Sequence, residues 1–319
     1  MGLIGIVVGA APAIGPTMSG LIVDYFGWRY IFIFLIIASI LILICASFIR
    51  TNTGEKVEGR LEFLSVLLYG VGFCGLMLGV TNQEIYGWGS YFTVIPIITG
   101  FICLFAFTTR QLKLSEPLLQ LRILTNTRFA ISTILIMITY ISMMSGTLMV
   151  PIYIQSVMGL SAVISGAVLF PGAALLTFFS PVTGFLFDKY GVRIITLLGM
   201  TLLLFGTGAF SVFDIETSLV LITIMYAVRM IGISFLLMPL QAYGVSKLES
   251  KNLSHATAII NSLRQISGAL GSSVLVAIMS AASANRDIID IKGINFSFGI
   301  QTCIIIVALL CTLRFIKNR

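Results

Sequence analysis

The sequence begins with an apolar stretch that is rich in glycine and proline, Gly5-Ile-Val-Val-Gly-Ala-Ala-Pro-Ala-Ile-Gly-Pro-Thr-Met-Ser-Gly20. In a water-exposed helix each glycine costs about 1 kcal/mol relative to alanine, and an interior proline costs about 3 kcal/mol. A membrane tolerates both residues, because neighbouring helices satisfy the freed backbone groups and small residues let helices pack closely. The stretch therefore predicts a kinked, closely packed transmembrane helix in a multi-span bundle.

The composition of the whole chain supports a membrane protein. Hydrophobic residues make up 58% of the sequence and charged residues only 10%, whereas soluble domains are about 45–50% apolar. The net charge of +7 resides mainly in short loops between apolar runs, so it predicts membrane orientation and not nucleic-acid binding. The five cysteines all fall inside apolar runs, which favours packing over a disulfide or metal role.

Ten apolar runs are long enough to be membrane spans, each near the 20 residues that cross a bilayer. The expected fold is an all-α polytopic membrane protein. The predicted spans cover residues 2–23, 29–49, 63–81, 91–109, 129–150, 161–186, 194–213, 218–242, 255–281 and 296–316.

The loops between these spans alternate in basic content. One set holds fourteen basic residues: Arg50, Lys56, Arg60, Arg110, Lys113, Arg122, Arg128, Lys189, Arg193, Lys247, Lys251, Arg314, Lys317 and Arg319. The other set holds three: Arg29, Arg286 and Lys292. Because basic residues accumulate on the cytoplasmic side, we expect the first set and the C-terminus to be cytoplasmic in a multi-pass protein of the cell membrane.

Arg229 lies near the middle of a predicted span, in Tyr226-Ala-Val-Arg-Met-Ile-Gly232. A charge at the bilayer centre costs from about 3 to more than 10 kcal/mol, so it needs a partner or an aqueous cavity. Two roles fit equally well. Arg229 either faces a cavity and binds substrate or tunes an acid on another helix, or it is locked to backbone carbonyls between helices.

A second polar group lies in the next span, in Asn261-Ser-Leu-Arg-Gln-Ile-Ser-Gly268. Asn261 and Gln265 are four residues apart and share a helix face, with Arg264 beside them. Such a stripe either lines a water-filled path or joins helices by hydrogen bonds. We therefore regard Asn261, Arg264 and Gln265, together with Arg229, as candidates for a substrate cavity.

Signatures of an enzyme or an ATP-driven pump are missing from the sequence. All twelve acidic residues fall in predicted loops or at span ends, and His255 begins a span. No phosphate-binding Gly-rich loop, metal cluster or catalytic triad appears. The chain is therefore expected to be neither an enzyme nor a metal or cofactor protein.

The loop after the sixth span reads Gly184-Phe-Leu-Phe-Asp-Lys-Tyr-Gly-Val-Arg193. Gly191 can close a tight turn at positive φ, and Asp188 and Arg193 can pair across the helix ends. The loop is either a latch that opens when the protein opens to the inside or a plain turn with solvated charges.

These features together resemble the major facilitator superfamily, and within it the fourteen-span drug:proton antiporter branch of EmrB-, QacA- and LmrB-type exporters. The opening stretch resembles the antiporter motif of the fifth helix in that branch, with Ser19 in place of a usual glycine and Trp28 and Arg29 following. The matching residues are Gly9, Gly15, Pro16 and Gly20.

Two further motifs carry the resemblance. Gly184, Asp188, Gly191 and Arg193 resemble the C-terminal copy of the superfamily's loop motif. Arg229, with Gly232, resembles the intramembrane arginine motif that is usual in helix four.

The resemblance implies a partial major facilitator fold that begins at helix five. Residues 1–50 would then be the last two helices of the N-terminal bundle, 51–127 a two-helix central insertion, and 128–319 the C-terminal six-helix bundle. In this interpretation four N-terminal helices are missing from the chain, either because it is truncated or because another chain supplies them.

The implied function is efflux of amphipathic or cationic small molecules by drug:proton antiport, with the proton gradient as energy source and no cofactor. The expected partners are membrane lipid, a small-molecule substrate and, in one reading, the missing helices on another chain. Two alternatives stay open: a non-transporting fragment or subunit that needs a partner, and an uncoupled facilitator.

Overall fold

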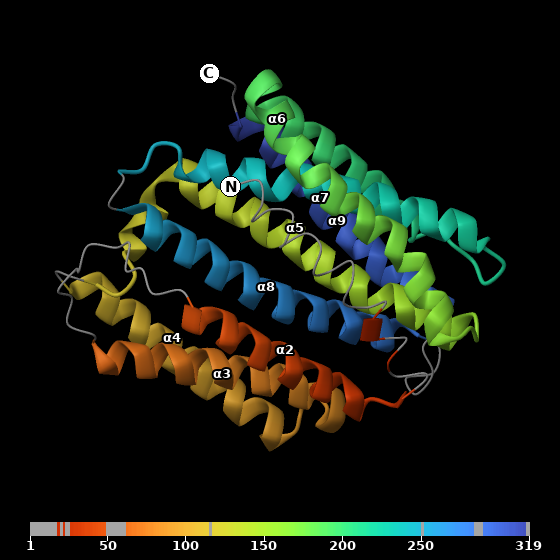
Figure 1. The fold of residues 1–319 in the computed structure, drawn as a ribbon, viewed down its shortest axis with the longest axis horizontal. Coiled ribbons are helices and arrows are strands. Elements are labelled where there is room, and N and C mark those ends of the chain that lie inside the picture. The colour runs from red at the N-terminus through yellow and green to blue at the C-terminus, as the bar shows by residue number, and fades with distance from the viewer. Residues whose placement is uncertain are drawn as a thin grey trace.

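The computed structural model describes Met18, Ser19, Ile22 and residues 26–48, 62–114, 117–249, 252–283 and 290–316. In these residues the regular structure is entirely helical (Figure 1). The elements are α2 (Arg29–Phe48), α3 (Phe63–Tyr86), α4 (Tyr91–Lys113), the 3₁₀ turn η1 (Leu121–Thr125), α5 (Thr127–Ile152), the π-helical segment η2 (Tyr153–Val157), α6 (Ala162–Ala209), α7 (Leu219–Val245), α8 (Leu253–Ala282) and α9 (Ile291–Phe315).

The described helices coincide with the predicted spans. Eight helices are long and apolar enough to cross a membrane, and nine of the ten predicted spans coincide with them, because α6 contains two. The first predicted span, residues 2–23, lies almost wholly outside the described residues. The antiporter-motif residues Gly9, Gly15, Pro16 and Gly20 lie outside them as well.

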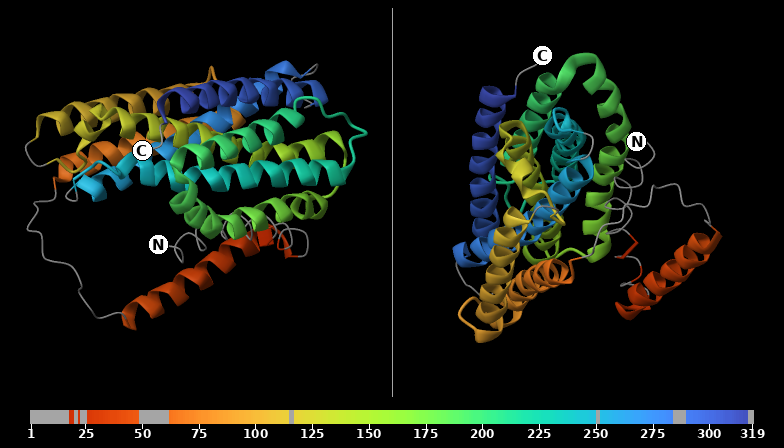
Figure 2. Two further views of the ribbon diagram at one scale, coloured as in Figure 1. Left: turned by 90° about the horizontal axis from the view of Figure 1, so that it is seen from above. Right: turned by 90° about the vertical axis from the view of Figure 1, so that its left-hand side faces the viewer.

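Helix α6 is two membrane spans joined at Gly191. Its 48 residues would extend about 72 Å as one straight helix, more than twice the hydrocarbon thickness of about 30 Å. Gly191 has φ 78° and ψ 168°, a combination that is essentially restricted to glycine. The chain reverses there, and α6 forms an arch (Figure 2). The positive φ predicted for Gly191 is confirmed.

The helices begin at side chains that accept hydrogen bonds from the first free N–H groups. The Asn126 side chain accepts bonds from the backbone N–H groups of Arg128 and Phe129, at 3.1 and 3.3 Å. The Asp290 carboxylate accepts one from Gly293 N–H at 2.9 Å. These caps satisfy donors that have no partner inside the helix. They also explain why α5 and α9 begin before the apolar runs that predicted them.

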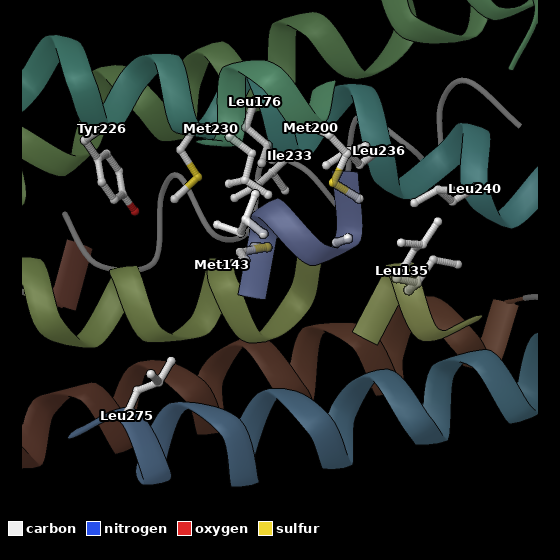
Figure 3. Packing of buried hydrophobic residues seen from close by; sticks show 14 of the residues in the cluster. Leu135, Met143, Leu176, Met200, Tyr226, Met230, Ile233, Leu236, Leu240 and Leu275 are labelled. Carbon is white, nitrogen blue, oxygen red and sulfur yellow. The ribbon is translucent and has the colours of Figure 1, made fainter. Parts of the chain in front are cut away.

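Helices α5 to α9 form a bundle around one apolar core. Figure 3 shows Met143 of α5 beneath Met230 and Ile233 of α7 in this core. The part of α6 that follows Gly191 lies very close to α7. A Cβ atom on Gly232 of α7 would lie only 2.6 Å from the backbone N of Leu203 in α6. Small residues at helix contacts are typical of membrane bundles, where close packing replaces the hydrophobic effect.

Helices α3 and α4 form a separate hairpin. A Cβ atom on Gly100 would lie 2.7 Å from the backbone N of Leu76, so the two backbones are in direct contact. Arg110 at the end of α4 pairs with Glu62 at the start of α3, at 2.5 Å. The hairpin contacts the bundle through α8, where the Tyr69 hydroxyl donates to Ser262 Oγ at 2.9 Å.

Helix α2 packs little against the rest of the described chain. None of its residues from Arg29 to Ser47 is buried, and Figure 2 shows it lying apart from the bundle. Its surface is almost entirely aliphatic and aromatic, as is typical of a helix that contacts lipid or other membrane helices.

Candidate functional site

Arg229 is the largest fully buried side chain of the described residues, with 0% of its surface exposed. It projects from the middle of α7 toward α5, α6 and α9. Its Nε donates to Thr207 Oγ1 at 3.1 Å. Its Nη2 donates to the Ser142 carbonyl and, at 3.2 Å, to Ser142 Oγ. The same nitrogen lies 3.3 Å from Gln301 Oε1.

The acceptors around Arg229 are themselves fixed by hydrogen bonds. Gln301 of α9 is buried, and its amide nitrogen donates to Ser145 Oγ. Ser145 Oγ in turn donates to the Ser142 carbonyl at 3.0 Å. The network therefore joins α5, α6, α7 and α9 through one guanidinium group. Its five residues, which we call the Arg229 network, are Ser142, Ser145, Thr207, Arg229 and Gln301.

Two glycines make room for this network. A Cβ atom on Gly146 would lie 1.4 Å from Arg229 Nη1. A Cβ atom on Gly206 would lie 2.7 Å from the Arg229 backbone N. The ring of Phe298 covers the guanidinium, with 5.9 Å between Arg229 Cζ and the ring centroid. Any larger residue at position 146 would occupy the place of the guanidinium.

The Arg229 network contains neutral acceptors only. Arg229 forms no ion pair with a carboxylate within the described part of the chain, and its Nη1 has no hydrogen-bond partner there. A buried cation of this kind is held by oriented dipoles, because every polar group left unpaired in a dry interior costs free energy. Of the two roles that the sequence left open, this geometry fits the interhelical one.

Arg264 lies in a second polar cluster, on α8. Its Cζ is 5.0 Å from the ring centroid of Tyr140, which belongs to α5. The Tyr140 hydroxyl lies 3.3 Å from Gln265 Oε1. Asn261 and Gln265 are exposed, and Arg264 is partly exposed. We call Tyr140, Asn261, Arg264 and Gln265 the Tyr140 cluster.

The two clusters lie on different sides of α5. Ser142 and Gly146 face Arg229, whereas Tyr140 faces α8, where a Cβ atom on Gly268 would lie 2.6 Å from its ring. The four residues expected to share a cavity are thus divided between an enclosed network and an open surface. Whether they bind substrate stays a prediction.

The loop-motif residues lie at the end of the bundle where α6 reverses. Asp188 is exposed, and the ammonium group of Lys189 lies 5.2 Å from the ring centroid of Tyr190. A Cβ atom on Gly184 would meet nothing within 4 Å. Arg193 is partly buried two residues after Gly191. The motif therefore shapes a turn, and its role as a latch stays a prediction.

The sequence interpretation missed the partners of both arginines. Ser142, Ser145, Thr207 and Gln301 were not singled out, nor was Tyr140. Their common signal is a polar residue inside a predicted apolar span, such as Gln301 in the span 296–316. That signal does not say which helices meet, because contact between helices depends on tertiary packing.

Outside the two clusters, the described residues offer a cavity but no cluster of metal-binding side chains. No group of three His, Cys, Asp or Glu residues that could hold a metal ion occurs in them. A cavity of about 300 Å³ opens beside the end of α4, lined by Thr109, Arg110, Lys113 and Leu114. It lies beside the predicted cytoplasmic loop and away from both clusters.

Sequence comparison finds a family match over most of the chain. The Major Facilitator Superfamily matches residues 1–272. The MFS-type transporter YcnB of Bacillus subtilis is 33% identical over 322 residues, covering 99% of this chain and 68% of that protein. The lincomycin resistance protein LmrB of Listeria monocytogenes is 36% identical, covering 88% of this chain and 60% of that protein.

More distant relatives and a solved structure agree with this assignment. The tetracenomycin C resistance and export protein of Streptomyces glaucescens is 26% identical, covering 86% of this chain and 51% of that protein. The chain thus spans about half to two thirds of the length of these relatives. A crystal structure of a mutant nucleoside transporter NupG covers 99% of this chain and 90% of that chain, with a TM-score of 0.54 and 12% identity, which shows the fold alone.

The helical bundle, the membrane-spanning lengths and the family match over residues 1–272 lead to one assignment. The chain belongs to the major facilitator superfamily of membrane transporters.

Proposed function

We propose that the chain acts in drug export, as a carrier of amphipathic or cationic small molecules that is driven by drug:proton antiport. The observation that carries the proposal is the match to relatives named for drug resistance or export, at up to 36% identity. The bundle α5 to α9 would form one half of the carrier, and substrate would bind near the membrane midplane, where such carriers hold it.

Within this function the Arg229 network would hold one half of the carrier rigid. Alternating access moves one helical unit against another, so each unit must keep its internal packing during the cycle. Arg229 bonds side chains or backbone of three other helices. The contacts support a structural role for Arg229 in transport and leave substrate binding to other residues.

We further propose that the end of the bundle near Gly191 faces the cytoplasm. Lys189 and Arg193, beside Gly191, belong to the set of loops and tail that holds fourteen of the seventeen loop and tail basic residues, and such residues accumulate on the cytoplasmic side. Green fluorescent protein fused after Arg319 should be fluorescent if this end is cytoplasmic. A non-fluorescent but membrane-inserted fusion would reverse the orientation.

A subunit that works only with a partner chain is a second candidate function, favoured by α2. This helix has no buried residue among those described, although its surface is strongly apolar. Helices of a partner would cover that surface. In this case purified chain would migrate with a second protein, and the chain expressed alone would not transport.

The test is substrate accumulation in cells. A drug-sensitive bacterial strain that expresses the chain should accumulate less ethidium and less lincomycin than the strain with empty vector, and a protonophore should remove the difference. Equal accumulation in both strains would reject export by this chain alone. Faster flux of substrate down its own gradient, unchanged by a protonophore and without reduced accumulation, would favour the uncoupled facilitator.

A further inference from the structure

The Tyr140 cluster is a polar surface within the helix pair α5 and α8. Arg264 is the twelfth of the 30 residues of α8, about 16 Å along the helix axis from its first residue. Since the 30 residues of α8 extend about 45 Å and the hydrocarbon core is about 30 Å thick, Arg264 lies inside the core when the core is centred on the helix. Asn261 and Gln265 are exposed there. Because exposure of such groups to lipid is costly, they need to be covered by water, by a polar ligand or by another membrane helix.

The guanidinium of Arg264 is available for a ligand. Within the described residues it forms no ion pair and donates no hydrogen bond, and its Nε is buried without a partner. Its Cζ lies over the face of the Tyr140 ring, 5.0 Å from the ring centroid. This differs from Arg229, whose Nε and Nη2 are bonded to protein acceptors.

The aromatic ring in the cluster is held in place. A Cβ atom on Gly268 would lie 2.6 Å from the Tyr140 ring, so only glycine lets the ring lie against α8. The Tyr140 hydroxyl contacts Gln265 at 3.3 Å. A fixed ring with a guanidinium over its face places an aromatic surface and a charged donor next to each other. That combination suits a flat ligand that carries an acidic group.

We propose that the Tyr140 cluster is a substrate subsite that binds aromatic amphipathic acids, with the ligand carboxylate on Arg264 and its ring against Tyr140. The exposed amides of Asn261 and Gln265 would donate further hydrogen bonds to the ligand. This inference rests on the proposed export function and specifies part of its substrate range: acids in addition to cations.

Binding measurements separate this proposal from transport. The full chain is purified into nanodiscs of phosphatidylcholine, and equilibrium dialysis compares 9-anthracenecarboxylate with its uncharged isostere 9-anthracenecarboxamide. The carboxylate should bind about tenfold more tightly or better, the usual gain from a hydrogen bond to a charged group. Equal binding of the two, or no binding of either, overturns the subsite.

Variants test whether Arg264 is the residue that binds the ligand carboxylate. Arg264→Gln should reduce the ratio of the two dissociation constants to about one, and Arg264→Lys should retain part of it. Arg122→Gln is the matched control, because Arg122 is an exposed arginine whose Nη2 donates a hydrogen bond to the Leu112 carbonyl at 2.8 Å, away from the Tyr140 cluster. An undiminished ratio in Arg264→Gln would overturn the assignment. If that variant does not fold, the comparison of Arg264→Lys with the wild type decides.

Two further outcomes distinguish related explanations. Phosphatidylglycerol in the nanodisc should not displace the carboxylate, and displacement would make the site a lipid-headgroup site. If the purified chain binds the carboxylate more tightly than the carboxamide but cells that express it show no efflux, the subsite is supported and export is rejected. If cells export ethidium but the purified chain binds the carboxylate and the carboxamide equally, export is supported and the subsite is rejected.

Discussion

Arg229 is stabilised at its buried position by a glycine and by neutral acceptors. The guanidinium fits because Gly146 has no side chain, and it is held by Ser142, Thr207 and Gln301. None of these contacts depends on a titrating carboxylate. The position of the charge is therefore set by packing, and changes in volume should matter more than changes in pH.

Gly146→Ala should destabilise the bundle strongly. The new Cβ atom would lie 1.4 Å from Arg229 Nη1, so the arginine must leave its acceptors. Overpacking of a core typically costs about 1–3 kcal/mol, and a displaced buried charge adds to that cost. Thermal unfolding of the purified chain measures the effect. Gly299→Ala is the control, because a Cβ there meets nothing within 4 Å; equal stability of the two variants would contradict the account.

Arg229→Lys should also lower stability, by on the order of 1–2 kcal/mol, given the size of hydrogen bonds between membrane helices. Lysine keeps the charge but cannot reach Thr207, Ser142 and Gln301 with one planar fork. Arg264→Lys is the matched substitution at a partly exposed arginine and should change stability little. A larger loss in Arg264→Lys than in Arg229→Lys would show that the Arg229 network is not the stabilising one.

At the scale of elements, the reversal within α6 depends on one backbone conformation. Gly191 adopts φ 78° and ψ 168°, which other residues reach only with strain. The conformation of Gly191 sets the direction of the chain on both sides of the turn, where Asp188 and Arg193 lie. The sequence could predict the turn because glycine between two apolar spans is a local signal.

Gly191→Ala should therefore cost about 1–3 kcal/mol of stability, the usual cost of a strained backbone conformation. Gly191→Asn should not restore the loss, because asparagine tolerates the left-handed helical region and ψ 168° lies outside it. Gly184→Ala, with open space around its Cβ, should be tolerated. Full stability of Gly191→Asn in thermal unfolding would show that the turn relaxes to a left-handed helical conformation.

The hairpin α3–α4 should lose stability in acid. The Arg110 guanidinium, and then the Ser65 hydroxyl, hold the pKa of Glu62 below its usual range. A lowered folded-state pKa contributes stability above the unfolded pKa of about 4.3, and this contribution is lost as the pH falls through the folded-state value. The effect is small because the pair is partly exposed.

Comparing Glu62→Gln with the wild type measures this contribution. The wild type should be the more stable at pH 7, and the difference between the two melting temperatures should shrink toward pH 3. A difference that stays constant over this range would exclude the ion pair as its cause.

At the scale of the whole molecule, membrane spans were predictable and helix contacts were not. Apolar length located nine spans, and even α6 was anticipated as two of them because Gly191 and charged residues interrupt the apolar run. The partners of Arg229 and Arg264 could not be predicted, since Gln301 is 72 residues from Arg229 along the chain and sequence spacing does not determine which helices pack together. The division of the chain at residues 50 and 127 stays a prediction.

The proposal that this chain exports small molecules in exchange for protons has a direct test. The direct test uses purified chain in liposomes with an acidic interior and measures ethidium uptake, because an antiporter moves its substrate into the acidic compartment. The account predicts accumulation that nigericin, which collapses the pH gradient, abolishes. No accumulation, or accumulation that nigericin leaves unchanged, would contradict the account.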